Sequence, residues 1–581
     1  MKRWLIIILA IFLIQVPLPG SSHNVKEIEI SLNFGKPVVV NGEVKVENAT
    51  SYLYIPDHPI LPLFRKTFVF PPSAILSIDF KFSGKGRMKV GKLREYPEPL
   101  SGSLLSYPPD KATWFEYRMG RGLYDGKDRL FLTIFVRPVK YSSGELTYIE
   151  KATITISYSA DTRYKDTNEE ENLLIIAPKE FLGPAYHLAN FKRNNTKMDV
   201  YVVDLETIYN QSEGRDYPEK IKYYIKHAVE EWKVKYVLLI GTKGKIPTRE
   251  VVYRVFPYTY LFISDLYYAD IYDAWGNFSS WDTNGDGIFG ETTDDIDLYP
   301  DVYIGRFLCE DTGEAWIVVN KTINYESNTE KNWFKKLVLC GGDIFPWGRD
   351  ITYKMLMKIL ANKTIKSRIA AEGEYLGDVV ASYMEGFEIE RIYATGLLRS
   401  DAKFLSKKNI NEAINRGCGF VYFAGHGTPV NWLAYLPFFY SIPLPFPLGY
   451  TISNVKKLDN GEKLPVMVFL ACSVGDFSQL DDPLAWKFVE WKKGGAVAVF
   501  ASTFTGYLAP GTFCTETFGG YLTTDVFKLY INGEKIAGKI WGDSIVDYLN
   551  NGSMGVESLE GMDRLTVEEW ILFGDPSLRI G

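Results

Sequence analysis

Short stretches rich in Val, Ile, Phe and Thr dominate the first quarter of the chain, and clusters of Pro and Gly separate them. Several stretches alternate apolar with polar residues, which is the pattern of a β-strand with one buried face. The stretches lie at 25–32, 38–46, 74–82, 130–136 and 152–158. The pattern predicts an all-β domain over residues 23–160.

The pattern changes after residues 161–172, a polar stretch without apolar periodicity that is typical of an exposed linker. Fully apolar runs then alternate with helix-like stretches, which is typical of a parallel sheet covered by helices. One set of runs occupies 173–177, 200–203, 236–240 and 302–304, and a second set occupies 337–340, 389–393, 420–424, 466–471 and 496–501. We expect α/β subdomains at 173–330 and 331–581, built as two α/β units or as one long sheet in two halves.

The N-terminus has the features of a secretory signal peptide over residues 1–22. Met1, Lys2 and Arg3 precede an apolar run over 4–14, and Pro, Gly and Ser follow it. The run is too short for a comfortable membrane span, and no second run of about 18 apolar residues follows. We therefore expect a secreted or cell-surface protein without a stable span beyond this segment, the alternative being an uncleaved N-terminal anchor.

Composition excludes several classes of protein. The net charge of −6 gives no electrostatic reason to expect a nucleic-acid binder. Five cysteines in 581 residues are too few for a disulfide scaffold, and the five histidines include no pair at the i, i+4 spacing of a helix-borne zinc site. If the chemistry uses imidazole or thiol, very few side chains can supply it.

Two strand ends in the second subdomain carry reactive side chains next to glycines. His426 follows the run 420–424 and Cys472 follows the run 466–471. Ligands bind beyond the carboxyl ends of strands in open α/β sheets, so neighbouring strands would bring this pair together. The imidazole would activate the thiol, and the Gly427 and Cys472 N–H groups would hold an oxyanion. The alternative is a buried structural cysteine and an unrelated loop histidine.

Several motifs resemble the gingipain family of cysteine peptidases. They are FAGHGTPVNW, PVMVFLACSVGDF, GGAVAVFAST and LFGDPSL, in this order, together with the segment 300–328. The segment 130–159 resembles the family's N-terminal propeptide. The resemblance implies a caspase-like parallel-sheet catalytic region in two α/β subdomains, preceded by an all-β propeptide domain. It also implies that Cys472 is the nucleophile and His426 its partner, with Gly427 and Cys472 forming the oxyanion hole.

The resemblance implies roles for three further residues. Asp343 matches a carboxylate that orients the histidine, although an Asx turn is the alternative. Asp350 is similar in position to the acidic residue that binds a basic side chain in arginine-specific members, and a helix N-cap is the alternative. Tyr507 resembles the aromatic residue that covers the specificity pocket, and it could equally be a partly exposed loop tyrosine.

An acidic insertion in the first subdomain predicts a cation site. Oxygen ligands at alternate positions followed by glycine make a loop that suits calcium. The candidate ligands are Asp282, Asn284, Asp286, Ile288 and Glu291. Position twelve of the pattern is Thr293 instead of Glu, and Asp294 or Glu291 could substitute. We expect structural Ca²⁺ and no cofactor for catalysis, the alternative being a solvated acidic loop.

The leading hypothesis is a secreted cysteine endopeptidase made as a zymogen. Its partners would be protein or peptide substrates and its own propeptide as inhibitor. With a preference for Arg or Lys before the scissile bond, Arg163 or Lys165 in the linker would be the activation site. The alternatives are a sortase-like transpeptidase of the same family and a non-catalytic, calcium-stabilised surface protein.

Overall fold

A computed structural model describes most of the chain. The described residues are 25–55, 58–95, 113–159, 171–196, 198–255, 258–345, 371–436, 448–552 and 561–581. Three expectations lie outside these residues: the signal peptide 1–22, the linker sites Arg163 and Lys165, and Asp350. No helix among the described residues is both long and apolar enough to cross a bilayer.

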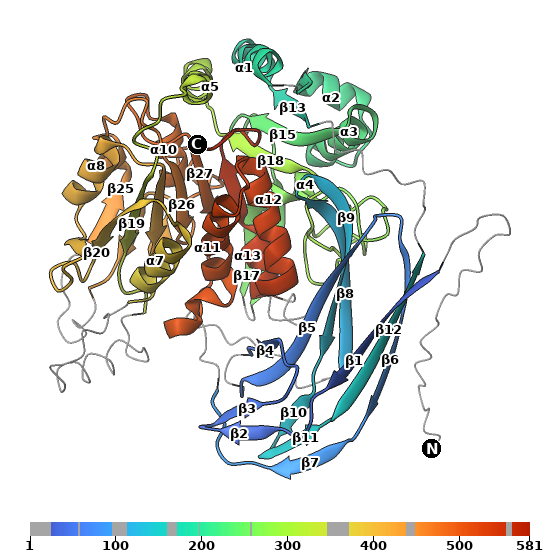
Figure 1. The fold of residues 1–581 in the computed structure, drawn as a ribbon. Coiled ribbons are helices and arrows are strands. Elements are labelled where there is room, and N and C mark those ends of the chain that lie inside the picture. Colours follow the sequence, from blue (N-terminus) through green and yellow to red (C-terminus); the bar gives the residue numbers. More distant parts are fainter. Residues whose placement is uncertain are drawn as a thin grey trace.

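The N-terminal region is built from antiparallel sheets, drawn in blue and cyan in Figure 1. One has the order β1-β12-β6 and another the order β4-β5-β9-β8. Their strands are β1 (Lys26–Asn33), β12 (Lys151–Ser159), β6 (Ile75–Ser83), β4 (Ser51–Leu53), β5 (Leu61–Phe70), β9 (Lys127–Val136) and β8 (Phe115–Tyr124). Alternate side chains of both sheets, including Leu132, Ile134 and Ile154, are buried in one core.

The smaller sheets of this region lie at one end. They have the orders β10-β11-β7 and β2-β3. Their strands are β10 (Val139–Ser142), β11 (Glu145–Tyr148), β7 (Gly86–Lys89), β2 (Val38–Val40) and β3 (Glu43–Lys45). Leu146 and Val44, from β11 and β3, share a small buried cluster that ties these ribbons together.

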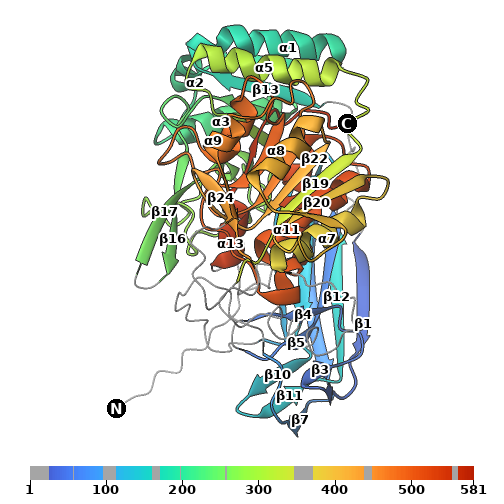
Figure 2. The same cartoon turned by 90° about the vertical axis from the view of Figure 1, so that its left-hand side faces the viewer.

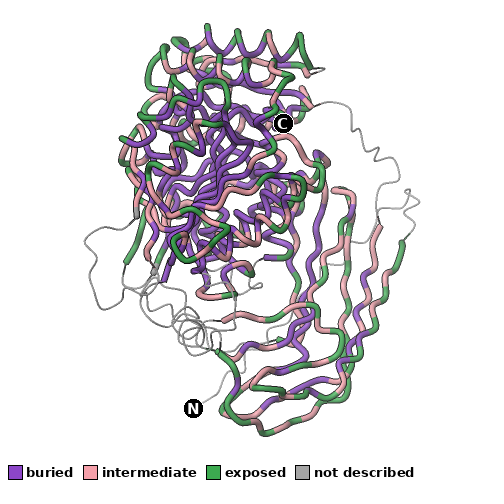
Figure 3. The backbone as a smooth tube through the Cα atoms, turned by 60° about the vertical axis from the view of Figure 1, so that its left-hand side comes forward, coloured by how far each residue is buried: buried purple, intermediate pink, exposed green. Residues whose placement is uncertain are grey.

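Among the described residues, the rest of the chain is built around one sheet of 11 strands, with two small antiparallel sheets beside it, so the long single sheet is the arrangement adopted. The order is β14 (Val200–Asp204), β13 (Asn172–Ala177), β15 (Val234–Ile240), β18 (Tyr303–Phe307), β28 (Trp570–Phe573), β27 (Ala498–Ser502), β26 (Val466–Leu470), β22 (Phe420–Ala424), β19 (Lys336–Gly341), β20 (Glu388–Tyr393) and β21 (Ala402–Phe404). Figure 3 shows these central strands buried, whereas the N-terminal strands alternate between buried and exposed positions.

The sheet reverses direction at β28. This strand is parallel to β18, through the pair Arg306 and Phe573, and antiparallel to β27. The two halves of the sheet therefore run in opposite directions. The carboxyl ends of β22, β26 and β27 lie at the edge where β28 begins, since Ser502 pairs with Trp570.

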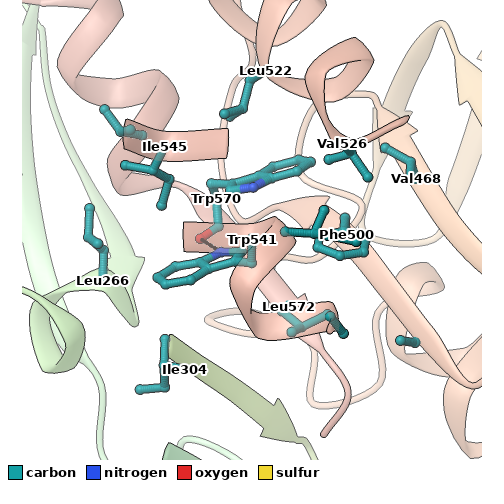
Figure 4. Packing of buried hydrophobic residues seen from close by; sticks show 14 of the residues in the cluster. Leu266, Ile304, Val468, Phe500, Leu522, Val526, Trp541, Ile545, Trp570 and Leu572 are labelled. Carbon is teal, nitrogen blue, oxygen red and sulfur yellow. Dashed lines mark hydrogen bonds between the residues drawn. The ribbon is translucent and has the colours of Figure 1, made fainter. Parts of the chain in front are cut away.

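Helices cover both faces of the sheet (Figures 1 and 2). One face packs against α1 (Leu182–Asn195), α5 (Thr312–Ser327), α8 (Lys407–Arg416) and α10 (Leu484–Glu490). The other packs against α3 (Tyr217–Trp232), α7 (Glu372–Tyr383), α11 (Phe518–Ile531) and α12 (Ala537–Asp547). Figure 4 shows Trp541 of α12 and Trp570 of β28 in this second core, joined by a hydrogen bond from Trp541 Nε1 to the Trp570 carbonyl oxygen (3.2 Å).

The N-terminal region docks on the α/β region through β8. Leu123 donates its N–H to the Pro300 carbonyl oxygen at 2.7 Å, and Phe131 of β9 stacks on Tyr299 with ring centroids 5.1 Å apart. Gly120 of β8 faces the same tyrosine, and a Cβ atom there would overlap its ring. The glycine permits the close approach of the two regions.

Candidate active site

His426 lies directly beyond β22, at the carboxyl edge of the sheet. It begins β23 (His426–Thr428), which pairs with β24 (Asn431–Ala434). The half-buried ring packs against Tyr435, and its Nε2 lies 2.8 Å from the Ile344 carbonyl oxygen. A carbonyl only accepts, so Nε2 carries the hydrogen and Nδ1 has the lone pair of a base. Burial lowers the pKa of the imidazole, which keeps it neutral.

Cys472 follows β26, the strand next to β22. Its Sγ lies 3.6 Å from the Gly506 carbonyl oxygen. Burial, and then the Glu569 carboxylate, raise the pKa of this thiol to about 11. The other four cysteines are buried, as expected of small core residues, and all five are free thiols. Cys472 is therefore the half-buried one of the five cysteines, and its thiol is held in its protonated form.

The two strand ends are in contact. Ala424 and Leu470, the last residues of β22 and β26, are register partners, and Gly425 donates its N–H to the Leu470 carbonyl oxygen at 3.0 Å. A Cβ atom added to Gly427 would lie 2.5 Å from the Cys472 carbonyl oxygen. The His-Gly turn thus packs on the backbone of Cys472 with no space for a side chain.

The turn after Cys472 is held in an unusual conformation. Ser473 has a φ of 54°, in the left-handed region that a residue with a side chain rarely adopts. Its N–H donates to the Phe504 carbonyl oxygen at 2.7 Å, and its carbonyl accepts the Asp476 N–H at 3.0 Å. Local strain fixed by two hydrogen bonds is typical of a functional turn.

The two amide groups expected to form an oxyanion hole come from two neighbouring segments. That of Cys472 directly precedes this turn, and that of Gly427 lies in the β23–β24 hairpin, where Gly427 is opposite Trp432. Whether this N–H and that of Cys472 hold an oxyanion stays a prediction.

Asp343 lies at the end of β19, where the sequence places it, and it is 2% exposed. Its Oδ1 accepts the Phe345 N–H at 3.0 Å, which is the Asx turn considered as the alternative. Its backbone forms a β-bridge with that of Tyr435, whose ring packs against His426. The next residue, Ile344, supplies the carbonyl oxygen that contacts His426 Nε2. Sequence reasoning missed the Ile344 carbonyl, because a backbone acceptor leaves no side-chain signal.

Tyr507 is 4% exposed, so it is not a partly exposed loop residue. Its hydroxyl lies 2.9 Å from the Tyr253 hydroxyl. Glu569, which the sequence did not single out, is buried under the same loop, and its Oε1 would lie 3.6 Å from a Cβ atom at Gly506. Its Oε2 has no hydrogen-bond partner among the described residues. Burial raises the pKa of this carboxyl well above its usual range.

The acidic insertion forms a loop of short-range hydrogen bonds. Asn284 Oδ1 accepts the Asp286 N–H at 2.9 Å, and Asp286 Oδ1 accepts the Ile288 N–H at 2.8 Å. Asp282 pairs with Arg215, and Glu291 pairs with Arg254 at 2.6 Å. No group of three or more His, Cys, Asp or Glu side chains within the described ranges is arranged to hold a metal ion. Calcium therefore stays a prediction.

Two known proteins are similar in sequence to this chain. Gingipain R2 of Porphyromonas gingivalis is 24% identical over 460 residues, which is 74% of this chain and 48% of the relative. Gingipain R1 of the same species is 23% identical over 451 residues, 72% of this chain and 35% of the relative. The chain thus spans about half the length, or less, of these relatives.

A solved structure and a family model complete the comparison. The crystal structure of the Arg-specific cysteine proteinase gingipain R has a TM-score of 0.50 at 22% identity, covering 72% of this chain and 80% of that one, and it shows the shared fold. Residues 166–581 match the model of peptidase family C25. The chain therefore belongs to peptidase family C25.

Proposed function

We propose that this protein is a cysteine endopeptidase in which Cys472 attacks the peptide carbonyl and His426 moves the proton. The observation that carries the proposal is the 2.8 Å contact between His426 Nε2 and the Ile344 carbonyl oxygen. Because Nε2 donates to Ile344, Nδ1 is left as the proton acceptor, at the strand end next to the thiol. Membership of the family is consistent with this chemistry.

The reaction starts from a neutral pair, since burial raises the pKa of the thiol and lowers that of the imidazole. As Sγ bonds to the substrate carbonyl carbon, its proton passes to His426 Nδ1. The resulting oxyanion is held by the N–H groups of Gly427 and Cys472. The imidazolium then protonates the leaving amine as the C–N bond breaks. Water, deprotonated by the same imidazole, hydrolyses the thioester and restores the thiol.

The test compares the full chain with Cys472→Ala, His426→Ala and a matched control, Cys418→Ala, which removes a buried thiol on another element. We expect both site variants to lose peptide cleavage and labelling by a thiol-directed peptide inhibitor, and the control to keep both. Cleavage that survives Cys472→Ala overturns the proposal.

We also propose a preference for Arg or Lys before the scissile bond, with Asp350 as the binding carboxylate. The support is that one structural neighbour is described as Arg-specific. A peptide library scanned at the residue preceding the cut, on the wild type and Asp350→Asn, tests it. We expect basic residues to be preferred and the preference to collapse in the variant. An unchanged preference assigns Asp350 to a helix cap instead.

The N-terminal β-rich region is proposed as an inhibitory propeptide of an exported zymogen, cut at Arg163 or Lys165. Two of its residues contact the 3₁₀ helix η2 (Gly511–Thr515), four residues beyond Tyr507. Tyr54 and Phe513 have ring centroids 5.8 Å apart, and the Arg94 guanidinium lies 5.0 Å from the same Phe513 ring. We expect Arg163→Gln/Lys165→Gln to stay uncut and latent, and cleavage elsewhere in the double variant would refute the site.

Structural calcium at the acidic insertion is proposed on the ligand pattern alone. Binding would require Asp282 and Glu291 to exchange their arginine partners for the cation. We expect calcium to raise the unfolding temperature of the wild type above its value with a chelator, and not to raise that of Asp286→Ala. An equal temperature in both conditions would leave a solvated loop.

A further inference from the structure

A two-stranded ribbon, β16 (Arg249–Val255) and β17 (Tyr258–Ser264), projects from the α/β region and is visible at the left of Figure 2. Val252 donates its N–H outward to the Phe289 carbonyl oxygen at 3.1 Å. Its register partner is Leu261. Opposite residues of an antiparallel pair direct their amides the same way, inward or outward. Leu261 therefore directs its N–H and C=O away from β16. Thr259 and Ile263 lie two residues to either side in the same strand, so their N–H and C=O groups point the same way.

The outer edge of β17 is hydrogen-bonded at its Ile263 end and accessible at its Leu261 and Thr259 end. The Ile263 carbonyl oxygen accepts the Thr503 hydroxyl at 2.7 Å. The outward amide and carbonyl groups of Leu261 and Thr259 have no hydrogen-bond partner within the described part of the chain. Leu261 is 61% exposed. An open strand edge of this kind is a template on which another extended chain can pair.

The open edge leads to the nucleophile. Thr503, which closes its inner end, directly follows β27. The next residues hold the catalytic turn, since the Phe504 carbonyl accepts the Ser473 N–H and the Gly506 carbonyl lies 3.6 Å from Cys472 Sγ. A chain extended along β17 would therefore run out from the loop beside the reacting thiol.

A ladder of aromatic rings follows the same path on one face of the ribbon. Phe504 stacks on Phe262 with centroids 5.2 Å apart, and its ring centroid is 5.9 Å from that of Tyr260, which is 6.2 Å from that of Tyr258. The ladder is buried at Phe262 and becomes exposed outward, with Tyr260 41% and Tyr258 63% exposed. Exposed aromatic rings on a strand face suit apolar side chains of a paired chain.

We propose that the substrate polypeptide binds as an added strand along the outer edge of β17, remote from the scissile bond. This inference rests on the proposed peptidase function. The occupant is an extended peptide because the edge offers main-chain hydrogen bonds, and because its inner end abuts the turn that carries the nucleophile. The bonds to Leu261 and Thr259 would supply affinity, and Tyr258 and Tyr260 would favour apolar or aromatic side chains at alternate substrate positions.

The experiment uses peptides that share the residues around the cut and are lengthened on either the N-terminal or the C-terminal side. We expect kcat/KM to rise about tenfold or more for one side only, once the chain reaches β17. N-methylation of single distal amides should abolish this gain in kcat/KM at every second substrate position, where the amide faces β17. At the intervening positions, where the amide points away, the gain should remain. An equal effect of N-methylation at every distal position would overturn the proposal.

Two variants at Leu261 distinguish the contribution of its backbone N–H to peptide binding from that of its side chain. Leu261→Pro removes an outward N–H that the ribbon itself does not use, and proline is tolerated at such edge positions. Leu261→Ala keeps the N–H and serves as its matched control. We expect the ratio of long-peptide to short-peptide kcat/KM to fall in the proline variant and to persist in the alanine variant.

The outcomes separate this inference from the peptidase function. Cys472-dependent cleavage of short peptides with no gain from length refutes the strand site alone. Absence of any cleavage refutes the function. A change of oligomeric state in Leu261→Pro at an unchanged ratio would assign the edge to a second copy of the chain and would also overturn the proposal.

Discussion

At the scale of single residues, the Cys472 thiol is held in its protonated form by its surroundings. Burial is the larger cause and the Glu569 carboxylate the second. Burial also raises the pKa of Glu569, so its carboxylate opposes the thiolate only at pH values where Glu569 is ionised. At those pH values we expect Glu569→Gln to lower the pKa of Cys472 and to raise its alkylation rate at a fixed pH below that pKa, by up to about tenfold per pKa unit. The pH profile of iodoacetamide labelling measures this change.

A matched variant identifies the source of that shift. Glu516→Gln neutralises an exposed carboxyl beyond Tyr507, which is not among the groups that raise the Cys472 pKa. Its labelling profile should match the wild type. An unchanged profile in Glu569→Gln would mean that burial alone sets the reactivity of the thiol.

At Gly427, the absence of a Cβ atom permits the close packing of the His-Gly turn on the Cys472 backbone. A Cβ atom there would lie 2.5 Å from the Cys472 carbonyl oxygen, so Gly427→Ala must move the turn that carries the N–H proposed as an oxyanion donor. We expect kcat/KM to fall by about a hundredfold, the usual effect of losing one oxyanion donor. Gly183→Ala, whose added Cβ would meet only Trp316 at 3.6 Å, is the control. Equal activity of both variants would contradict the assignment.

At the scale of elements, the joint between the two halves of the sheet depends on Arg306 of β18. Its guanidinium binds the Asp265 carboxylate through Nε at 2.7 Å and Nη2 at 2.8 Å, and donates through Nη1 to the Gly241 carbonyl oxygen at 2.9 Å. It also lies over the Phe477 ring, which belongs to the segment following Cys472. This buried pair therefore links the half of the sheet that contains β18 to the segment that follows Cys472.

Asp265→Asn leaves the Arg306 charge buried without its counter-charge. We expect it to lower the free energy of unfolding by about 3–5 kcal/mol, because removing one partner exposes the full desolvation cost of the other. Urea unfolding followed by tryptophan fluorescence measures the change. Glu412→Gln, which breaks an exposed pair with Lys408, should leave the transition near that of the wild type. A similar small effect at Asp265 would refute the linking role.

The sequence predicts the strands of the central sheet well, because a strand buried on both faces is a continuous apolar run. It does not predict the reversal at β28, since a run such as Trp570–Phe573 carries no direction of its own. The β16–β17 ribbon is also missed. Its position depends on Phe289 and Phe504, which are distant in the chain. At the site, motifs locate His426 and Cys472, but a backbone acceptor such as Ile344 cannot be read from side-chain types.

At the scale of the whole molecule, the N-terminal region and the α/β region share a buried contact that the chain must break to separate them. Tyr303 donates its hydroxyl to Asp543 Oδ1 at 3.1 Å and accepts the Gly126 N–H at 2.9 Å. Thr133 of β9 donates to the Asn550 side chain at 3.1 Å. Asn550 also accepts the Tyr299 hydroxyl at 2.8 Å, and Gly120 packs against the ring of that tyrosine. The sheets of the two regions are thereby held in one fixed relation.

Gly120→Val tests whether this contact maintains latency. The added side chain would overlap the Tyr299 ring, whereas Gly91→Val introduces the same side chain at a site with open space. Because the N-terminal region keeps its own core, we expect Gly120→Val to weaken docking without unfolding the α/β region. The uncut precursor should then cleave short peptides several-fold faster than the wild-type precursor, and the processed enzymes should be equal. Equal latency in Gly120→Val and Gly91→Val would show that inhibition resides in other contacts, such as those of Tyr54 and Arg94 with Phe513.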